Sequence, residues 1–354
     1  MSNDENFLIV ETRMYNYSST SNMSDMCLGN GRSFFTTTLL PVIYSLLFIG
    51  SLIMNSIAAW IFFQTNSKKS YVVFLKNIVV ADLVMTSTFP FTVLNYAQVS
   101  TNVLNQIVCR FSAVVFYSTM YISIILLALI SLERYIKIVK LPEGNIFQNV
   151  KYSQIITIVV WVFMFSITVP NMIMNKNNVV LENRMQCASL KTDLGLKWHK
   201  FSTYFSMFIF WTTFILMVIC YTFVLKAVYE SHKNTDVRLS GGKRKSRRNI
   251  FCILGVFFIC FVPYHVSRIP FTLSQTEDVF NCRTDKALFY VKEGTLLVSA
   301  ANVCLDPIIY FLLCKSFTKS VLQNFRILQK KRKMSTVHHV FLKKVTVDSG
   351  QSTS

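Results

Sequence analysis

Long stretches of apolar residues recur along the 354-residue chain, and short polar segments separate them. Each stretch holds about twenty residues or more, which at about 1.5 Å per residue is long enough to cross a hydrocarbon core of about 30 Å. The helices of a soluble bundle would instead carry their apolar residues on one face. The pattern therefore predicts seven membrane-spanning helices, at residues 37–63, 71–96, 107–139, 152–175, 200–231, 246–274 and 286–314.

The predicted fold class is all-α, a seven-transmembrane helix bundle with a short amphipathic eighth helix. Residues 1–36 form an extracellular N-terminal tail in this prediction, and residues 37–314 form the transmembrane domain. Residues 315–328 have the pattern of an amphipathic helix on the inner leaflet. Residues 329–354 are rich in Ser, Thr and Lys, which predicts a disordered cytoplasmic tail.

The distribution of charge orients the chain. The formal net charge of +19 could by itself indicate a nucleic-acid partner. The basic residues, however, concentrate in residues 68–76, 137–151, 241–248 and 329–333, and seven spans place all four regions on one side. An excess of Lys and Arg marks the cytoplasmic side. We therefore expect a multi-pass plasma-membrane protein with an extracellular N-terminus, surrounded by lipids and without a nucleic-acid partner.

The predicted extracellular side also carries residues that are typical of an oxidising compartment. Glycosylation sequons begin at Asn16 and Asn22, in agreement with the orientation. Disulfides persist outside the cell, and four cysteines fall on that side, Cys27, Cys109, Cys187 and Cys282. Four cysteines allow three pairings, and the sequence alone does not choose among them.

Ionisable residues near the outer ends of the spans indicate a binding site. Arg268 lies about twenty residues beyond the basic start of its span, or about 30 Å along a helix, and so near the outer edge of the hydrocarbon. His265 lies about one turn deeper on the same face. Other cationic or titratable residues at this level are Lys191, His199 and Lys292. An extracellular anion site is favoured over side chains that merely extend to the headgroups.

Three further residues near this level could shape a site. Tyr117 and Tyr121 are separated by one helical turn and could stack on a flat ring, although bundle packing is the better interpretation of these two residues alone. Pro263 removes one helix hydrogen bond and should kink its span. Such a kink would make a pivot between the outer and cytoplasmic halves of the helix.

A second polar group lies deeper in the predicted bundle. Its members are Asn55, Asp82, Ser123, Asn302 and Asp306. Carboxylates inside a bilayer need partners or a cation. These oxygen ligands could hold a sodium ion, or they could form a hydrogen-bonded knot with one carboxyl protonated; the residues favour neither alternative. Sodium is the one cofactor that the sequence suggests.

The sequence "LERY" at residues 132–135 lies at the predicted cytoplasmic end of the third span. Arg134 could reach the headgroups there. The neighbouring Glu133 offers an ion pair that a partner protein could break.

Together these landmarks resemble the rhodopsin-like G-protein-coupled receptors. The motifs that carry the resemblance are Asn55, "VVADL" at 79–83, "ERY" at 133–135, Trp161, "FFICFVPYH" at 257–265 and "DPIIY" at 306–310. The resemblance implies a disulfide between Cys109 and Cys187. It also implies coupling to a G protein through Glu133, Arg134, Tyr135 and Tyr310.

Within that family the chain is similar to the ADP and UDP-sugar subgroup of purinergic nucleotide receptors, above all to the platelet-type ADP receptors. The similarity rests on "LKNIVVADL" at 75–83, "MYIS" at 120–123, "GLKWH" at 195–199, "PYHVSRIPFTLSQT" at 263–276 and "YVKEGTL" at 290–296. It implies a second disulfide, between Cys27 and Cys282. Three residues depart from the subgroup, Gln186 for Lys, Thr203 for Asn and Phe271 for Tyr, and each departure weakens a polar contact.

The resemblance also implies the roles of the site residues. Arg268 and Lys292 would pair with phosphate oxygens. His265 would form a deeper hydrogen bond, and Tyr117 would stack on the base. The remaining members would be Asn171, Lys191, His199 and Gln275.

The sequence thus predicts a receptor that responds to an extracellular nucleotide, most of all ADP, and lowers cAMP through an inhibitory-class G protein. Arrestin and a receptor kinase could be further partners. UDP-sugars or another anion such as a lysophospholipid are the alternative ligands, and an anion transporter is the alternative function. An enzyme is not expected, because no nucleophile–base pair or metal set is visible in the sequence.

Overall fold

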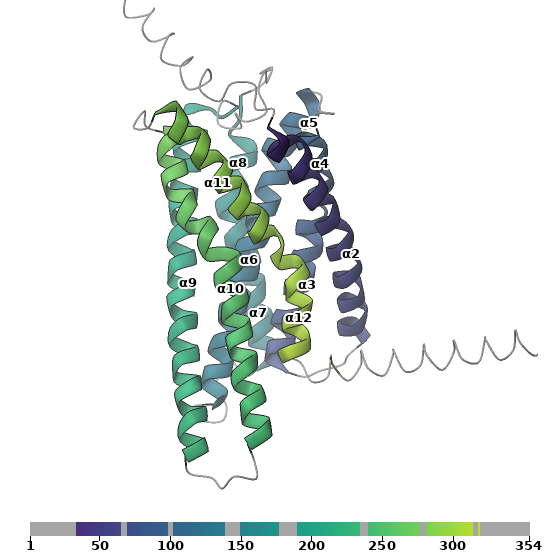
Figure 1. Ribbon diagram of the computed structural model, residues 1–354, viewed down its shortest axis with the longest axis vertical. Coiled ribbons are helices and arrows are strands. Elements are labelled where there is room, and N and C mark those ends of the chain that lie inside the picture. The colour runs from purple at the N-terminus through teal and green to yellow at the C-terminus, as the bar shows by residue number, and fades with distance from the viewer. Residues whose placement is uncertain are drawn as a thin grey trace, which may run out of the picture.

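The computed structural model describes residues 33–64, 69–97, 102–138, 149–176, 190–233, 240–276, 281–313 and 318. These residues form a bundle of helices, so the predicted all-α fold class is confirmed (Figure 1). The elements are η1 (Phe35–Leu39), α2 (Leu40–Gln64), α3 (Ser70–Thr86), α4 (Phe89–Tyr96), α5 (Asn102–Ile107), η2 (Val108–Ser112), α6 (Ala113–Ile138), α7 (Val150–Thr168), α8 (Pro170–Ile173), α9 (Asp193–Lys233), α10 (Ser240–Thr276), α11 (Cys282–Ala300) and α12 (Asn302–Leu313).

Several predictions fall outside the described residues. These are the amphipathic helix at 315–328 apart from Thr318, the tails before residue 33 and after residue 328, and the side chains of Asn16, Asn22, Cys27, Gln186, Cys187 and Gln275.

Seven helical segments in the described part of the chain are long and apolar enough to cross a membrane. They are Phe35–Gln64, Ser70–Tyr96, Val103–Lys137, Val150–Ile173, Asp193–Ala227, Ile253–Ser274 and Cys282–Tyr310. Each overlaps one predicted span. The fifth begins at Asp193 instead of residue 200, because its first turns are polar and hydropathy alone does not detect them. The seventh begins at Cys282 instead of residue 286 for the same reason.

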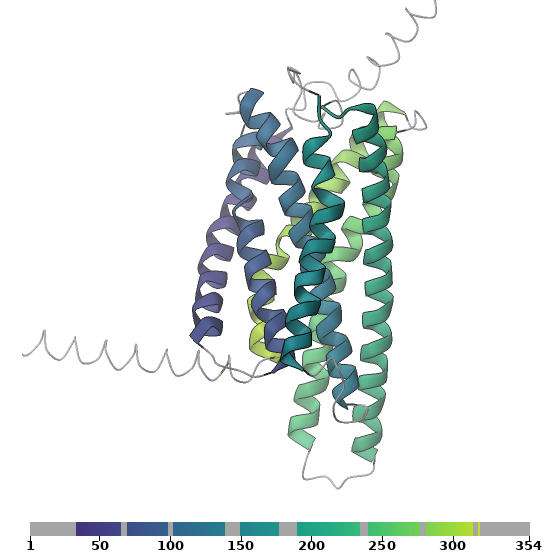
Figure 2. The ribbon, with the colours of Figure 1, turned by 180° about the vertical axis from the view of Figure 1, so that it is seen from behind.

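The third span lies at the centre of the bundle. Its main helix, α6, packs against α3, α7 and α9, while α10 packs against α9 and α11. In Figures 1 and 2, η1, α5 and α8 mark one end of the bundle, called the upper end here. At the lower end α9 and α10 extend beyond the other helices.

The outside of the bundle is apolar, as contact with lipid requires. On α2 the side chains of Leu46, Ile53 and Trp60 are exposed, whereas Tyr44 and Phe62 are buried. A helix that is hydrophobic all round meets the bundle on one side and lipid on the other. This explains why the sequence shows apolar blocks without stripes.

The helix α10 passes through Pro263 and Pro270 without a break. Pro263 has no N–H to donate to the carbonyl of Ile259, four residues earlier. Beside it, Ser299 of α11 donates a hydrogen bond to the Cys260 carbonyl with an Oγ–O distance of 2.6 Å. A side chain from the neighbouring helix thus bonds the carbonyl that follows the one Pro263 leaves without its helical donor.

Candidate functional site

A cavity of about 310 Å³ lies in the upper half of the bundle and is lined by side chains from all seven membrane-spanning segments. Seven of the predicted ligand-binding residues line it, Tyr117, Tyr121, Asn171, Lys191, His199, Arg268 and Lys292. Depth counting and the family resemblance together predicted this set, whose members are up to about half the chain apart in sequence. The cavity volume falls within the range of small-molecule sites, about 300–1,000 Å³.

Arg268, on α10, is a buried cation at the wall of the cavity. Its guanidinium carbon lies 5.8 Å from the ring centroid of Tyr117 and 5.7 Å from that of Phe271. Among the residues that the structure describes, none accepts a hydrogen bond from its guanidinium or forms an ion pair with it. A buried charge without a hydrogen-bond partner is costly. The geometry of Arg268 is therefore that of a group prepared for an anionic ligand.

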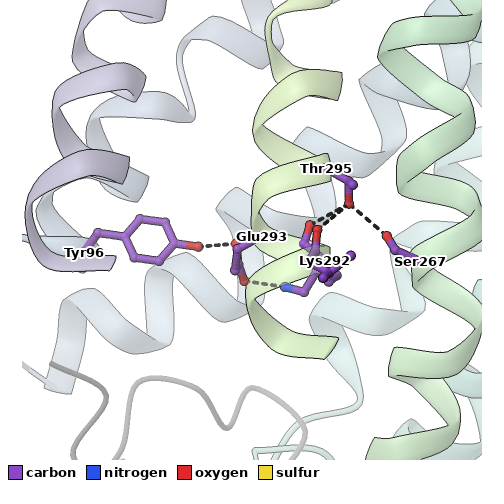
Figure 3. A network of polar contacts seen from close by, with 6 residues as sticks. Tyr96, Ser267, Lys292, Glu293 and Thr295 are labelled. Carbon is purple, nitrogen blue, oxygen red and sulfur yellow. Dashed lines mark hydrogen bonds and ion pairs between the residues drawn. The ribbon is translucent and has the colours of Figure 1, made fainter. Parts of the chain in front are cut away.

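Lys292, on α11, is also buried, but its charge is already balanced. Its Nζ forms an ion pair with Oε1 of Glu293, the next residue in the chain (Figure 3). Tyr96, at the end of α4, donates a hydrogen bond to the other carboxylate oxygen, Oε2, at 2.5 Å. Glu293 directly follows Lys292 in the sequence, whereas the contact with Tyr96 depends on how α4 and α11 pack.

Phe271 lies between the two cations. Lys292 Nζ is 4.9 Å from its ring centroid, close to the distance at which Arg268 meets the same ring. Cation–π attraction favours both arrangements. The tyrosine expected at this position would add a hydroxyl, whereas the phenyl ring of Phe271 offers the cations its aromatic face alone.

Lys191 and Asn171 form a polar contact on the opposite wall. Lys191 Nζ donates to Asn171 Oδ1 at 3.1 Å, and Asn171 Nδ2 donates to Ser202 Oγ at 3.1 Å. Burial disfavours the charged ammonium and lowers the pKa of Lys191 from its ordinary 10.5 to about 8. Thr203, one of the departures from the expected subgroup pattern, lines the same wall with His199.

His265 does not line the cavity, in contrast to the expected direct hydrogen bond with a ligand. It lies beneath the floor, where its Nε2 is 3.1 Å from the hydroxyl of Tyr121 and its Nδ1 is 2.7 Å from the Phe261 carbonyl. Because a carbonyl only accepts, Nδ1 carries the proton and Nε2 accepts from Tyr121. His265 therefore positions Tyr121, which does line the cavity.

The deeper polar group occupies facing helices below the cavity. Tyr310 donates to Asp82 Oδ2 at 2.9 Å, and Asn302 donates to Asp306 Oδ2 at 2.7 Å. Asn55 donates to the carbonyl of Val303 at 2.8 Å. Tyr310, which was predicted to act in G-protein coupling, thus reaches the acidic group as well.

The unsatisfied atoms of this group are all oxygens. Within the described part of the chain, buried oxygens without a hydrogen-bond partner include Asn55 Oδ1, Asp82 Oδ1, Ser123 Oγ, Asn302 Oδ1 and Asp306 Oδ1. The two carboxyls lie close enough to interact directly. Hard cations prefer such oxygen ligands, so the donor set fits a sodium ion.

The "LERY" motif at 132–135 lies near the C-terminal end of α6. The guanidinium carbon of Arg134 lies 4.6 Å from the ring centroid of Tyr71. Glu133 is buried, its Oε2 has no hydrogen-bond partner, and it forms no ion pair of 4.0 Å or less with another described residue. The predicted ion pair between Glu133 and Arg134 stays a prediction, and in this structure the guanidinium lies over the Tyr71 ring of α3. Tyr135 packs against Phe223 with a centroid distance of 5.7 Å.

Seven membrane-spanning helices around a cavity at one end, with a polar group below it, define a seven-helix membrane receptor. The sequence pattern of the 7 transmembrane receptor (rhodopsin family) matches residues 54–310. The chain is 46% identical to purinoceptor 14 of Bos taurus over 292 residues, which are 82% of this chain and 87% of the relative.

Two other receptors of this kind are also similar to the chain over most of its length. The chain is 41% identical to purinoceptor 13 of Rattus norvegicus over 300 residues, 85% of this chain and 88% of the relative. It is 39% identical to G-protein coupled receptor 87 of Mus musculus over 306 residues, 86% of this chain and 85% of the relative. The chain therefore belongs to the rhodopsin family of seven-transmembrane receptors and, within it, to the purinoceptors, which are nucleotide receptors. It is a multi-pass membrane receptor, and its family is not enzymatic.

Proposed function

We propose that this receptor responds to extracellular ADP and lowers cAMP through an inhibitory-class G protein. The observation that carries the proposal is Arg268, a buried cation at the cavity wall without an anionic partner among the described residues. A diphosphate would supply the missing acceptors, because guanidinium groups bind phosphate bidentately. The resemblance of "LSQTEDVFNC" at 273–282 and "LFYVKE" at 288–293 to the platelet-type ADP receptor favours ADP among the nucleotides.

The cavity offers a consistent pose for such a ligand. Phosphate oxygens would lie between Arg268 and Lys292, on α10 and α11. The base would stack on Tyr117, whose ring faces the cavity next to Arg268. Lys191, Asn171 and the side chain of His199 would complete the site from the opposite wall, with Gln275 as a further member.

Activation would transmit this contact to the lower end of the bundle. Phosphate binding would draw the upper ends of α10 and α11 together, and α10 would pivot near Pro263. Its basic lower end would then swing outward and expose Arg134 to the G protein. A ligand shifts this equilibrium only through its preference for the open form. Arrestin and a receptor kinase would act on the same face afterwards.

Several finer features belong to the same proposal. The upper end would be extracellular, with glycosylation at Asn16 and Asn22. The disulfides would be Cys109–Cys187 and Cys27–Cys282, as the family resemblance implies. The five unpartnered oxygens support an allosteric sodium ion between Asp82 and Asp306.

A ligand panel tests the proposal. Cells that express the full chain would receive ADP, UDP-glucose or a lysophospholipid, and cAMP suppression would be measured with and without pertussis toxin. We expect the strongest response to ADP and its loss after toxin treatment. A response only to UDP-glucose or to the lysophospholipid would reassign the ligand. Uptake of isotope-labelled nucleotide above that of untransfected cells would instead support the transporter.

A further inference from the structure

Two cations line the cavity at the same level, yet only one of them is available to a ligand in this structure. Arg268 has no anionic partner among the described residues, whereas Lys292 forms an ion pair with Glu293. Glu293 supplies the one carboxylate among the described residues that line the cavity. The carboxylate therefore occupies a position on Lys292 that a phosphate oxygen would otherwise take.

The pair is held in place from outside α11. Neighbouring residues on a helix point in different directions, so the Lys292 side chain must bend to reach Glu293. Tyr96 fixes the far side of the carboxylate by its hydrogen bond of 2.5 Å. The Tyr96 ring in turn stacks on Tyr44, with a centroid distance of 6.2 Å. Glu293 is thus anchored to the first and second spans, opposite α10.

The pair is also largely shielded from water. The exposed fractions of the two side chains are 11% for Lys292 and 6% for Glu293. In a site of low polarity an ion pair is stronger than at a surface, and breaking it requires a replacement partner for each charge. A ligand phosphate can replace the carboxylate on Lys292, and Tyr96 can retain the carboxylate.

Resting on the proposed function, we infer that Glu293 is a tethered counter-anion for Lys292, which a ligand phosphate must displace before it can use that cation. The Lys292–Glu293 ion pair lowers the affinity of the empty site for anions. Only a ligand whose phosphate reaches Lys292 can replace the carboxylate there. Arg268 makes the first contact, and Lys292 is recruited second. Nearby, the hydroxyls of Ser267 and Thr295 join α10 to α11 by a hydrogen bond with an oxygen–oxygen distance of 2.8 Å (Figure 3).

The main test is Glu293→Gln, which keeps the size of the side chain and its acceptor for Tyr96 but removes the charge. We expect ADP to act at concentrations about three- to tenfold lower, because the ammonium is then uncommitted. Tyr96→Phe should shift the response in the same direction by less, because the carboxylate loses one anchor. The matched control is Asp193→Asn at the exposed start of α9, which removes a carboxylate that does not line the cavity and should change nothing.

A double-variant comparison separates displacement from simple repulsion of the ligand. If Glu293 acts through Lys292, most of the gain from Glu293→Gln disappears when Lys292→Gln is also present. A gain of the same size in both backgrounds would mean that Glu293 only repels phosphate through space, and it would overturn the inference. Unchanged or weaker ADP binding in Glu293→Gln alone would overturn it too, since the carboxylate would then be assisting the ligand.

A nucleotide-independent probe keeps this inference separate from the proposed function. Inorganic pyrophosphate would be added to the purified receptor, and thermal unfolding would be followed. We expect pyrophosphate to raise the Tm of Glu293→Gln more than that of the unmodified receptor. If no nucleotide in the panel acts but this difference remains, the proposed function is wrong and the counter-anion stands. An equal shift in both proteins would overturn the counter-anion.

Discussion

The two polar regions inside the bundle have opposite charge imbalances. The upper cavity contains Arg268, Lys292 and Lys191 against a single carboxylate in its described lining. The group below it contains Asp82 and Asp306, and its unsatisfied atoms are oxygens. Buried charge is tolerated when a partner of opposite sign completes it. Each region is therefore suited to a different mobile ion, an anionic ligand above and a small cation below.

The largest effect on the upper cavity is expected from Arg268. Replacing Arg268 with Ala should raise the ADP concentration needed for half-maximal cAMP suppression about 100-fold or more, because losing one buried charge partner costs about 3 kcal/mol. Arg268→Lys keeps the charge but loses the planar fork, and an intermediate loss of about tenfold is expected. Surface labelling would confirm equal expression. A normal ADP and UDP-glucose response in Arg268→Ala would exclude this cavity as the nucleotide site.

Lys292 should matter less than Arg268. We expect Lys292→Gln to weaken ADP binding about tenfold, because phosphate gains this ammonium only by separating it from Glu293. The same substitution in the Glu293→Gln background should have a larger effect, since the ammonium there is free of its counter-anion. Radioligand competition on membranes measures both values. Equal effects in the two backgrounds would show that the ion pair does not influence the ligand.

The sequence predicted most of the residues that line the cavity, but it did not predict their hydrogen-bond partners. Depth along a helix follows from counting residues, and it placed Arg268 and Lys292 correctly at one level. Counting does not fix which side chains of one helix face reach the cavity, because positions i and i+3 share a face but still differ by about 60° around the axis. His265 consequently turned out to support Tyr121 from below the cavity floor.

Contacts between distant spans could not be predicted from the sequence either, because they depend on how the helices pack. Tyr96 and Glu293 are 197 residues apart, and their hydrogen bond depends on how α4 and α11 pack. Tyr310 of "DPIIY" was predicted to act in G-protein coupling, and its hydroxyl reaches Asp82, 228 residues away. In both cases the residue type was visible in the sequence, and only the packing revealed its partner.

The lower region can be tested with sodium. In the proposed site, raising Na⁺ at constant ionic strength should weaken agonist binding about fivefold, with choline as the replacement cation, because an ion that favours the inactive form opposes the agonist. Asp82→Asn should abolish this dependence. Ser123→Ala should reduce it, while Ser131→Ala, a buried serine on the same helix that bonds the Leu127 carbonyl, serves as the control. Sodium dependence that survives Asp82→Asn would place the cation elsewhere.

The smallest expected effect concerns Lys191 and pH. Burial lowers its pKa to about 8, so the ammonium of the empty receptor loses its proton as the pH rises through that value. An anion favours the charged form, and we therefore expect ADP affinity to be highest below pH 8 and to fall about threefold between pH 7 and pH 9. Phosphate groups have their second pKa near 6, so the ligand itself changes little over this range. Lys191→Arg should bind with little pH dependence, because arginine stays charged. If that variant shows the same decline as the unmodified receptor in membrane binding measurements, another group is responsible for it.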